Sequence, residues 1–296
     1  MLWRYSHWRP KKQFNITKLK ELFGFGSKVL ASGIVSSLFE NLYSLVIGKV
    51  FNASELGYYR RAKSLQEVPS SLIYKVINVV YPSFSKIQED DVLLKRAFKK
   101  ANTFVAVINF LVMTLLFVTA EPFVLVVLTP KWQPVIIYLK IFCIAGFIYP
   151  LSGLILNAPL IKGRSDHFFY IELAKRVLLV LTIPIAIYFG TVLGFVIAFV
   201  IVSFISYFIN AHFAGKFIHY SFTEQFNDIL PFLVISLLVI VLIGLFNYYF
   251  QYNMVIMLIL NSFISVFLYL LFSYILKGGV IKEILKIIGE QIKTKQ

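Results

Sequence analysis

Long apolar stretches alternate with short polar segments along most of the chain. Eight of these stretches reach spanning length, at about residues 22–51, 65–87, 101–128, 133–161, 168–190, 192–214, 229–250 and 253–276. A helix needs about 20 apolar residues to cross the hydrocarbon core of a bilayer. The pattern therefore predicts an all-α fold, a polytopic membrane helix bundle with about eight transmembrane helices.

The composition of the 296 residues agrees with a membrane protein. Hydrophobic residues make up 59% of the chain and charged residues only 15%, whereas soluble domains have about 25% charged residues. This argues against a soluble enzyme, a secreted disulfide scaffold and a disordered chain. The single cysteine, Cys143, lies in an apolar run, and no metal-ligand spacing, nucleophile–base pair or ATP-binding motif is present. We expect no metal, no cofactor and no enzymatic activity.

The basic residues lie mainly on one side of the expected membrane. The chain has a net charge of +15, and 21 of its 29 Lys and Arg residues fall in 1–21, 86–100, 162–176, 212–228 and 277–296. The opposite segments, 52–64, 129–132, 190–192 and 247–253, hold only four. Because short cytoplasmic loops are rich in Lys and Arg, we expect both termini in the cytoplasm. The same residues are expected to contact anionic lipids and not nucleic acid.

Both ends of the chain carry amphipathic, basic segments. Residues 1–21 resemble a basic cytoplasmic linker with an amphipathic helix, and residues 277–296 an amphipathic cytoplasmic tail. Helices of this kind lie on the membrane surface.

Polar residues recur at helical spacing within the first two apolar runs. The first run contains Glu40 and Asn41, and the second contains Ser71, Lys75 and Asn78. Charges at the centre of a span usually face a cavity or a partner. Helix–helix packing would explain the small polar residues, but it explains the charges poorly. We therefore expect these five side chains to line a substrate cavity.

Opposite charges also occur at matched depths on the two runs. Glu40 and Lys75 lie at nearly equal distances from the turn at Gly57, which places both near the middle of the membrane. A second pair of opposite charge, Lys49 with Glu67, lies at the outer mouth, and two lysines, Lys28 and Lys86, lie at matched depth at the inner mouth. We expect Lys75 to neutralise an anionic headgroup, Glu40 to hold or release that lysine, and the inner pair to collect the headgroup.

Several short motifs carry a family resemblance. They are Gly48–Phe51, Glu55–Ala62 followed by Pro69, Tyr81–Asp90, Lys131-Trp132, and the inner-loop stretch from Asn157 to Asp166. Together they resemble the Wzx-type polysaccharide flippases, which belong to the superfamily of the MATE exporters, also called MOP. Pro130 stands where a glycine is common in that family.

The resemblance implies both a fold and a function. The chain looks like the second six-helix lobe of a MATE/MOP-type transporter (22–215) with two additional helices (216–276). Members of the family move undecaprenyl-diphosphate-linked oligosaccharides across the bacterial cytoplasmic membrane for O-antigen, capsule or exopolysaccharide biosynthesis. The implied partners are the polyprenyl-diphosphate-linked oligosaccharide and membrane lipids. The expected helices include no counterpart of the family's first lobe. Further candidate partners are therefore a first-lobe chain, a second copy of this chain or polysaccharide polymerase machinery.

Other functions remain open at this stage. A MATE-like ion-coupled exporter of small molecules would favour acidic groups in its cavity, which Lys75 opposes. A membrane enzyme such as a polysaccharide polymerase would need larger outer loops than 52–64. An inactive, truncated membrane protein is a further alternative.

Overall fold

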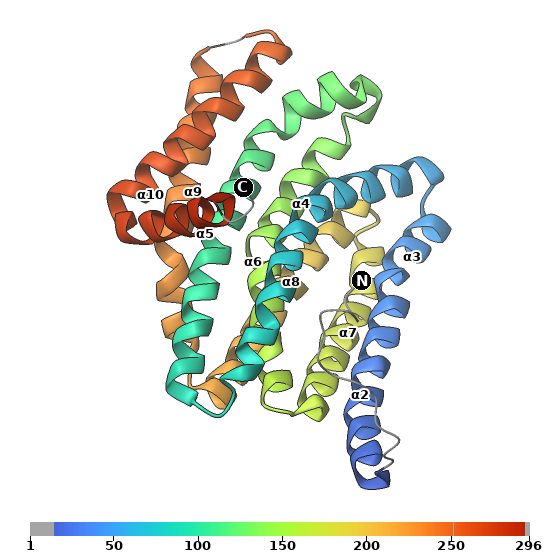
Figure 1. Cartoon of the computed structure of the whole chain (residues 1–296). Helices are drawn as coiled ribbons and strands as arrows, with labels where there is room; N and C mark the ends of the chain where they lie inside the picture. The colour runs from blue at the N-terminus through green and yellow to red at the C-terminus, as the bar shows by residue number, and fades with distance from the viewer. Residues whose placement is uncertain (1–14, 251, 294–296) are drawn as a thin grey trace.

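The computed structural model describes residues 15–250 and 252–293, and in this part the chain is a bundle of long helices (Figure 1). The α-helices are α2 (Ile16–Glu40), α3 (Leu42–Val50), α4 (Ala53–Lys86), α5 (Asp91–Phe123), α6 (Val135–Ile161), α7 (Ser165–Tyr188), α8 (Val192–Ile218), α9 (Phe222–Tyr249) and α10 (Met254–Lys293). A π-helical turn, η1 (Val124–Leu128), and a 3-10 turn, η2 (Pro130–Trp132), connect α5 to α6. The expected all-α membrane bundle is confirmed.

Six helical segments in the described part are long and apolar enough to cross a membrane. They are Ile16–Val50, Asp91–Leu128, Val135–Ile161, Val192–Ile218, Phe222–Tyr249 and Met254–Gly279. The two other long helices are α4 and α7, with 34 and 24 residues. Both have sufficient length, but they carry charges within their central turns. The number of long helical segments thus agrees with the sequence pattern, and α4 and α7 differ from the rest in polarity.

Several helices begin earlier than the apolar pattern predicts. The sequence suggested polar connections at 52–64, 86–100 and 162–176, yet α4 begins at Ala53, α5 at Asp91 and α7 at Ser165. Asn52 and Asp90 explain two of these starts, because their side chains accept hydrogen bonds from backbone N–H groups of the first turn. Charged residues that the pattern assigned to loops therefore lie on helices.

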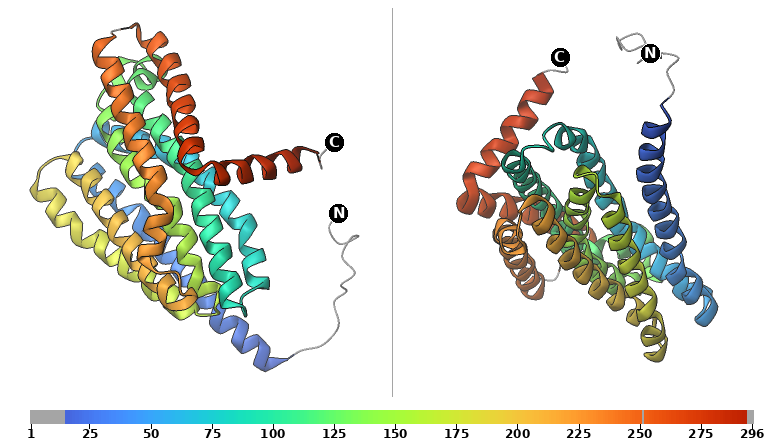
Figure 2. Two further views of the ribbon diagram at one scale, coloured as in Figure 1. Left: turned by 90° about the vertical axis from the view of Figure 1, so that its left-hand side faces the viewer. Right: turned by 90° about the horizontal axis from the view of Figure 1, so that it is seen from below.

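Two of the expected continuous helices are interrupted. The first apolar run divides at Asn41 into α2 and α3. In α10, Lys277 has non-helical dihedral angles (φ −140°, ψ 44°) just before two glycines. Figure 2 shows the segment after Lys277 turned away from the rest of α10. The side chains of the expected amphipathic tail lie outside the described residues, as do residues 1–14 of the expected linker.

The buried apolar side chains form two clusters at different levels of the bundle. One joins α3, the beginning of α4 and parts of α5, α6, α7 and α8, and includes Tyr43, Tyr59 and Phe142. The other joins α4, α5, α6, α8, α9 and α10, and includes Phe98 and Phe110. The helices that contribute to both clusters are α4, α5, α6 and α8.

Three turns meet at one end of the bundle. The Asp91 carboxylate forms an ion pair with Lys162 at the end of α6 (2.6 Å) and lies 3.9 Å from the His219 imidazole after α8. The Lys162 ammonium also donates to the carbonyl of Gln88 (2.5 Å). The α4–α5, α6–α7 and α8–α9 turns are therefore adjacent, as the charge asymmetry requires of segments on one side of a membrane.

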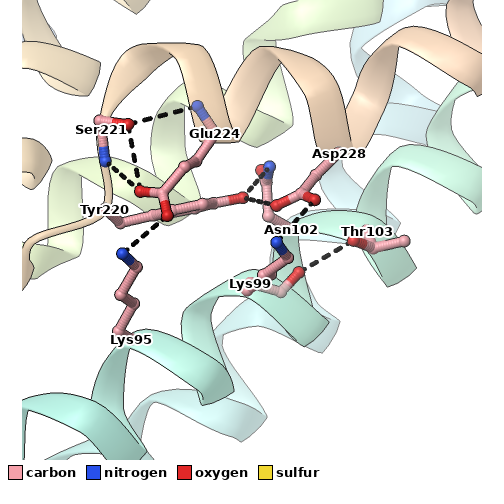
Figure 3. Close-up of polar contacts among 8 residues, drawn as sticks. All are labelled: Lys95, Lys99, Asn102, Thr103, Tyr220, Ser221, Glu224 and Asp228. Carbon is pink, nitrogen blue, oxygen red and sulfur yellow. Dashed lines mark hydrogen bonds and ion pairs between the residues drawn. The ribbon is translucent and has the colours of Figure 1, made fainter.

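The beginning of α9 is attached to α5 by polar contacts at the same end (Figure 3). Lys95 and Lys99 of α5 form ion pairs with Glu224 (2.7 Å) and Asp228 (3.2 Å) of α9. The buried Tyr220 donates its hydroxyl proton to Asp228 (2.7 Å), and its oxygen accepts from the Asn102 amide (3.1 Å). α9 therefore joins α5 through charged and buried polar groups as well as through apolar packing.

Candidate functional site

A cavity of about 390 Å³ lies between α3, α4, α6, α7 and α8. The residues that line it include Tyr59, Lys63, Glu67, Tyr74, Asn78, Tyr149, Gly153, Asn157, Glu172, Lys175, Arg176, Phe199 and Asn210. It lies where the two apolar clusters approach each other, since Tyr43 of one and Ile77 of the other both line it. A charged and polar cavity inside a membrane bundle is the main candidate for a functional site.

The charges on α7 form one compact group. The Glu172 carboxylate is largely buried, with a side-chain exposure of 8%, and forms ion pairs with Lys175 and with Arg176, the latter at 3.4 Å. The spacing of three and four residues places all three side chains on one face of the helix. Ser36 of α2 donates a hydrogen bond to the same carboxylate (3.1 Å). The group thus joins α7 to α2 and leaves one more cation than anion.

The charges on α4 form a second group. Lys63 forms an ion pair with Glu67 (3.4 Å), and the Glu67 side chain is 54% exposed. The Lys63 ammonium also lies 5.6 Å from the centre of the Phe199 ring on α8, a distance typical of a cation–π contact. With the α7 group, the cavity lining holds three cations and two carboxylates.

Amide and hydroxyl groups complete the polar lining. Asn210 of α8 donates to the carbonyl (3.0 Å) and the hydroxyl (2.7 Å) of Ser152. The Asn210 side-chain oxygen and the Tyr59 hydroxyl are buried without a hydrogen-bond partner among the described residues. Buried polar groups are usually paired, so these two atoms are exceptions beside the cavity.

The α6 wall of the cavity depends on prolines and on hydrogen bonds from neighbouring helices. Pro150 has no N–H, so the Gly146 carbonyl lacks its usual partner one turn later. The Asn109 amide on α5 donates to the carbonyls of Gly146 (2.9 Å) and Phe147 (2.7 Å). On the opposite side, Tyr74 of α4 donates to the Tyr149 carbonyl (2.9 Å). These bonds satisfy the backbone at the proline, as a helix within a membrane requires.

A glycine allows α4 to approach α6 closely at the same level. A Cβ atom at Gly153 would lie 2.3 Å from a ring carbon of Tyr74. The Tyr74 ring therefore lies directly over the Gly153 backbone, and no larger residue fits there without a shift of α4 or of the ring.

The structure brings two of the sequence-predicted residues to this cavity. Glu67 and Asn78 line it, whereas Lys75 is exposed on α4. Glu67 forms its ion pair with Lys63 of the same helix, while Lys49, its predicted partner, is exposed at the end of α3. The cavity thus contains two of the predicted residues of α4 together with charged groups from α7.

The remaining sequence-predicted residues lie outside the cavity lining. Ser71 is exposed and donates to the carbonyl of Val68 (2.7 Å). Asn41 is exposed at the junction of α2 and α3, where its amide donates to the Ser37 carbonyl (3.2 Å). Lys28 and Lys86 are exposed. Glu40 is the last residue of α2, and its side chain lies outside the described part of the structure.

Sequence reasoning missed four of the five charges that line the cavity: Lys63, Glu172, Lys175 and Arg176. All four fall in segments that either were assigned to loops or were counted at the edge of a span. A signal was present on α7, because Glu172, Lys175 and Arg176 share a helix face directly before an apolar stretch.

The chain is similar in sequence to proteins of polysaccharide biosynthesis. Residues 1–137 match the model of a family described as "Polysaccharide biosynthesis protein". The chain is 31% identical over 195 residues to the lipopolysaccharide biosynthesis protein WzxC of Escherichia coli (strain K12), which covers 64% of this chain and 40% of that protein. It is 24% identical over 239 residues to the teichuronic acid biosynthesis protein TuaB of Bacillus subtilis (strain 168), covering 80% and 50%.

A solved structure shares the fold. The lipid II flippase MurJ in an inward closed conformation superposes with a TM-score of 0.72 and 17% sequence identity, over 92% of this chain and 57% of that chain. The chain thus spans about half the length of the curated relatives it matches. These matches agree with the resemblance that the sequence motifs indicate: the chain is a multi-pass membrane protein that is similar in sequence to proteins of polysaccharide biosynthesis and shares its fold with the flippase MurJ.

Proposed function

We propose that the chain forms one lobe of a flippase that moves a polyprenyl-diphosphate-linked oligosaccharide across the bacterial cytoplasmic membrane. Residues 22–215 form the six-helix lobe, and residues 216–276 supply two additional helices. Short cytoplasmic segments of membrane proteins are rich in Lys and Arg. The basic segments of this chain, and with them both termini, therefore lie on the cytoplasmic side. The activity serves the biosynthesis of a surface polysaccharide.

The observation that carries this proposal is the charged cavity between α4 and α7. A lipid-linked oligosaccharide presents negatively charged phosphates and many hydroxyl groups. The lining offers three cations, and it adds amides, hydroxyls and aromatic rings that suit sugars. A headgroup that enters the membrane loses its charge stabilisation and hydrogen bonds from water. The cations and polar groups of the lining replace them.

The cavity favours this function over export of organic cations. Both carboxylates that line it, Glu67 and Glu172, already form ion pairs with lysine or arginine. A cation entering the cavity would have to displace these partners and would meet an excess of positive charge. A lining of this composition suits an anionic headgroup.

A deletion experiment tests the proposal. Lipids are extracted from cells that lack the gene, and undecaprenyl-linked oligosaccharides are quantified by mass spectrometry. We expect them to accumulate, and we expect the accumulation to disappear when the gene is restored in its native context. Unchanged levels in the deletion, in a strain without a second flippase gene, would contradict the proposal.

A further inference from the structure

The Glu172 carboxylate lies between the two cations of α7. One of its oxygens contacts the Lys175 ammonium, and the other lies 3.4 Å from the Arg176 guanidinium. The Glu172, Lys175 and Arg176 side chains are 8%, 13% and 19% exposed, so salt and water screen these contacts little. All three side chains line the cavity. An anion that enters to bind these cations therefore meets a carboxylate that already holds both of them.

A phosphate and the Glu172 carboxylate compete for the same two cations. Like charges at close range repel, and the repulsion is strong where water is scarce. The headgroup must therefore displace the carboxylate from at least one cation, and its net gain is the difference between two ion pairs. The carboxylate on α4 is a weaker competitor, because the Glu67 side chain is 54% exposed and solvent weakens exposed ion pairs.

A hydroxyl from a neighbouring helix gives the displaced carboxylate a remaining partner. Ser36 of α2 donates a hydrogen bond of 3.1 Å to the Glu172 oxygen that also faces Arg176. Ser36 itself lies outside the cavity lining, so a headgroup that takes Arg176 leaves this hydrogen bond in place. A buried carboxylate without any partner is costly, and the Ser36 hydroxyl lowers that cost.

We propose that Glu172 is a positioning residue that controls release: an internal counterion that competes with the anionic headgroup for Lys175 and Arg176. Before the headgroup binds, Glu172 holds both cations in place. While the headgroup is bound, Ser36 holds the carboxylate, and as the headgroup leaves the carboxylate takes the cations back. A transported group must bind weakly enough to leave, and this competition sets that limit. The inference rests on the proposed function, because it takes the headgroup as the anion.

Binding of a short polyprenyl diphosphate to the full chain tests the inference. Farnesyl diphosphate is titrated into the purified protein in detergent, and the Kd is measured by calorimetry. Glu172→Gln removes the competing charge at nearly constant size, so we expect a Kd about tenfold lower. Glu121→Gln is the matched control, because this carboxylate also pairs with a lysine of a membrane helix, Lys140 (3.8 Å), outside the cavity lining. For the control we expect the Kd of the unmodified protein.

Ser36→Ala tests the same competition with every charge kept. The carboxylate loses its other partner and holds the cations more firmly, so we expect the Kd to rise about threefold. Ser36→Thr retains a hydroxyl and is expected to restore the original Kd. Simple loss of stability would weaken binding in both Glu172→Gln and Ser36→Ala, whereas competition shifts their Kd values in opposite directions. Ser36→Ala and its rescue also decide the question where Glu172→Gln fails to fold.

Transport separates release from binding. In deletion cells that carry Glu172→Gln in the native gene context, we expect undecaprenyl-linked oligosaccharides to accumulate although the variant binds the diphosphate more tightly. A purely structural role of Glu172 predicts accumulation together with weaker binding.

An unchanged or higher Kd in folded Glu172→Gln would overturn the inference, and so would an unchanged Kd in Ser36→Ala. The proposed function fails separately. Opposite Kd shifts without accumulation in the deletion strain would keep the competition for an anion and remove the oligosaccharide as the substrate. Accumulation in the deletion strain, with no binding of farnesyl diphosphate to the chain, would remove only the competition.

Discussion

At the scale of single residues, the contact between α4 and α6 depends on the absence of a side chain at Gly153. Tyr74 lies against this glycine, lines the cavity and donates a hydrogen bond to the Tyr149 carbonyl. The glycine thus controls both the packing of two helices and the position of a cavity side chain.

Gly153→Ala is expected to destabilise the protein, because its new Cβ would lie 2.3 Å from the Tyr74 ring. Overpacking of this kind costs about 1–3 kcal/mol. Thermal unfolding in detergent measures the effect as a lower Tm. Gly244→Ala is the control, since nothing lies within 4 Å of the position of its Cβ. An equal Tm for the two variants would show that the close approach of α4 to α6 at Gly153 does not contribute to the stability of the protein.

Asn109 makes a second prediction at this scale. Asn109→Ala removes both donors that satisfy the Gly146 and Phe147 carbonyls at the α6 proline. Unsatisfied buried groups cost about 1–3 kcal/mol, so we expect a clear loss of unfolding free energy in denaturant titrations. Asn157→Ala is a milder comparison, because its amide donates only within its own helix, to Gly153 (3.2 Å). Similar losses for both variants would argue against a special role of Asn109.

At the scale of helices, α9 is held to α5 by the contacts around Tyr220 (Figure 3). The Tyr220 hydroxyl links Asn102 to Asp228, and Asp228 also forms an ion pair with Lys99. Tyr220→Phe keeps the ring and removes the link. The buried Asn102 amide then loses this acceptor, and the Asp228 carboxylate loses a donor.

We expect Tyr220→Phe to loosen the beginning of α9 more than the rest of the bundle. Hydrogen–deuterium exchange of peptides from Phe222–Tyr249 measures this, and faster exchange near Asp228 is the predicted result. Tyr248→Phe is the control, because that side chain is 78% exposed at the other end of the helix. Unchanged exchange in Tyr220→Phe would mean that the Tyr220 hydroxyl is not needed to hold α9 against α5.

The helices also show how far the sequence could be interpreted. Apolar runs of spanning length identified every long helix in the described part, because a helix that crosses a membrane presents a long apolar surface to lipid or to its neighbours. They misplaced the starts of α4 and α5, where charged residues continue the helix beyond the apolar stretch. Lys63 was therefore assigned to a loop, and Lys175 and Arg176 were counted with the connection 162–176, although all three line the cavity. Side-chain partners across helices, such as Ser36 with Glu172, depend on helix rotation and could not be predicted from spacing.

At the scale of the whole molecule, the two most polar long helices define the site. α4 and α7 supply the five charges of the cavity. The six more apolar segments surround and support them. This division of roles explains why the described part of the chain has eight long helical segments and only six of ordinary membrane composition.

The proposed role of the positive charge in the cavity is the transport of a lipid-linked oligosaccharide. The most direct measurement compares Arg176→Met with Lys140→Met, each restored to deletion cells in the native gene context. Lys140 is also a cation within a membrane helix, paired with Glu121 (3.8 Å), but it lies outside the cavity lining. Membrane abundance of both variants is measured beside the undecaprenyl-linked oligosaccharides.

We expect Arg176→Met to cause accumulation through a loss of flux of about tenfold, which corresponds to about 1.4 kcal/mol. Lys140→Met is expected to behave like the unmodified protein. Normal oligosaccharide levels in Arg176→Met cells, at equal abundance of the protein, would contradict the account.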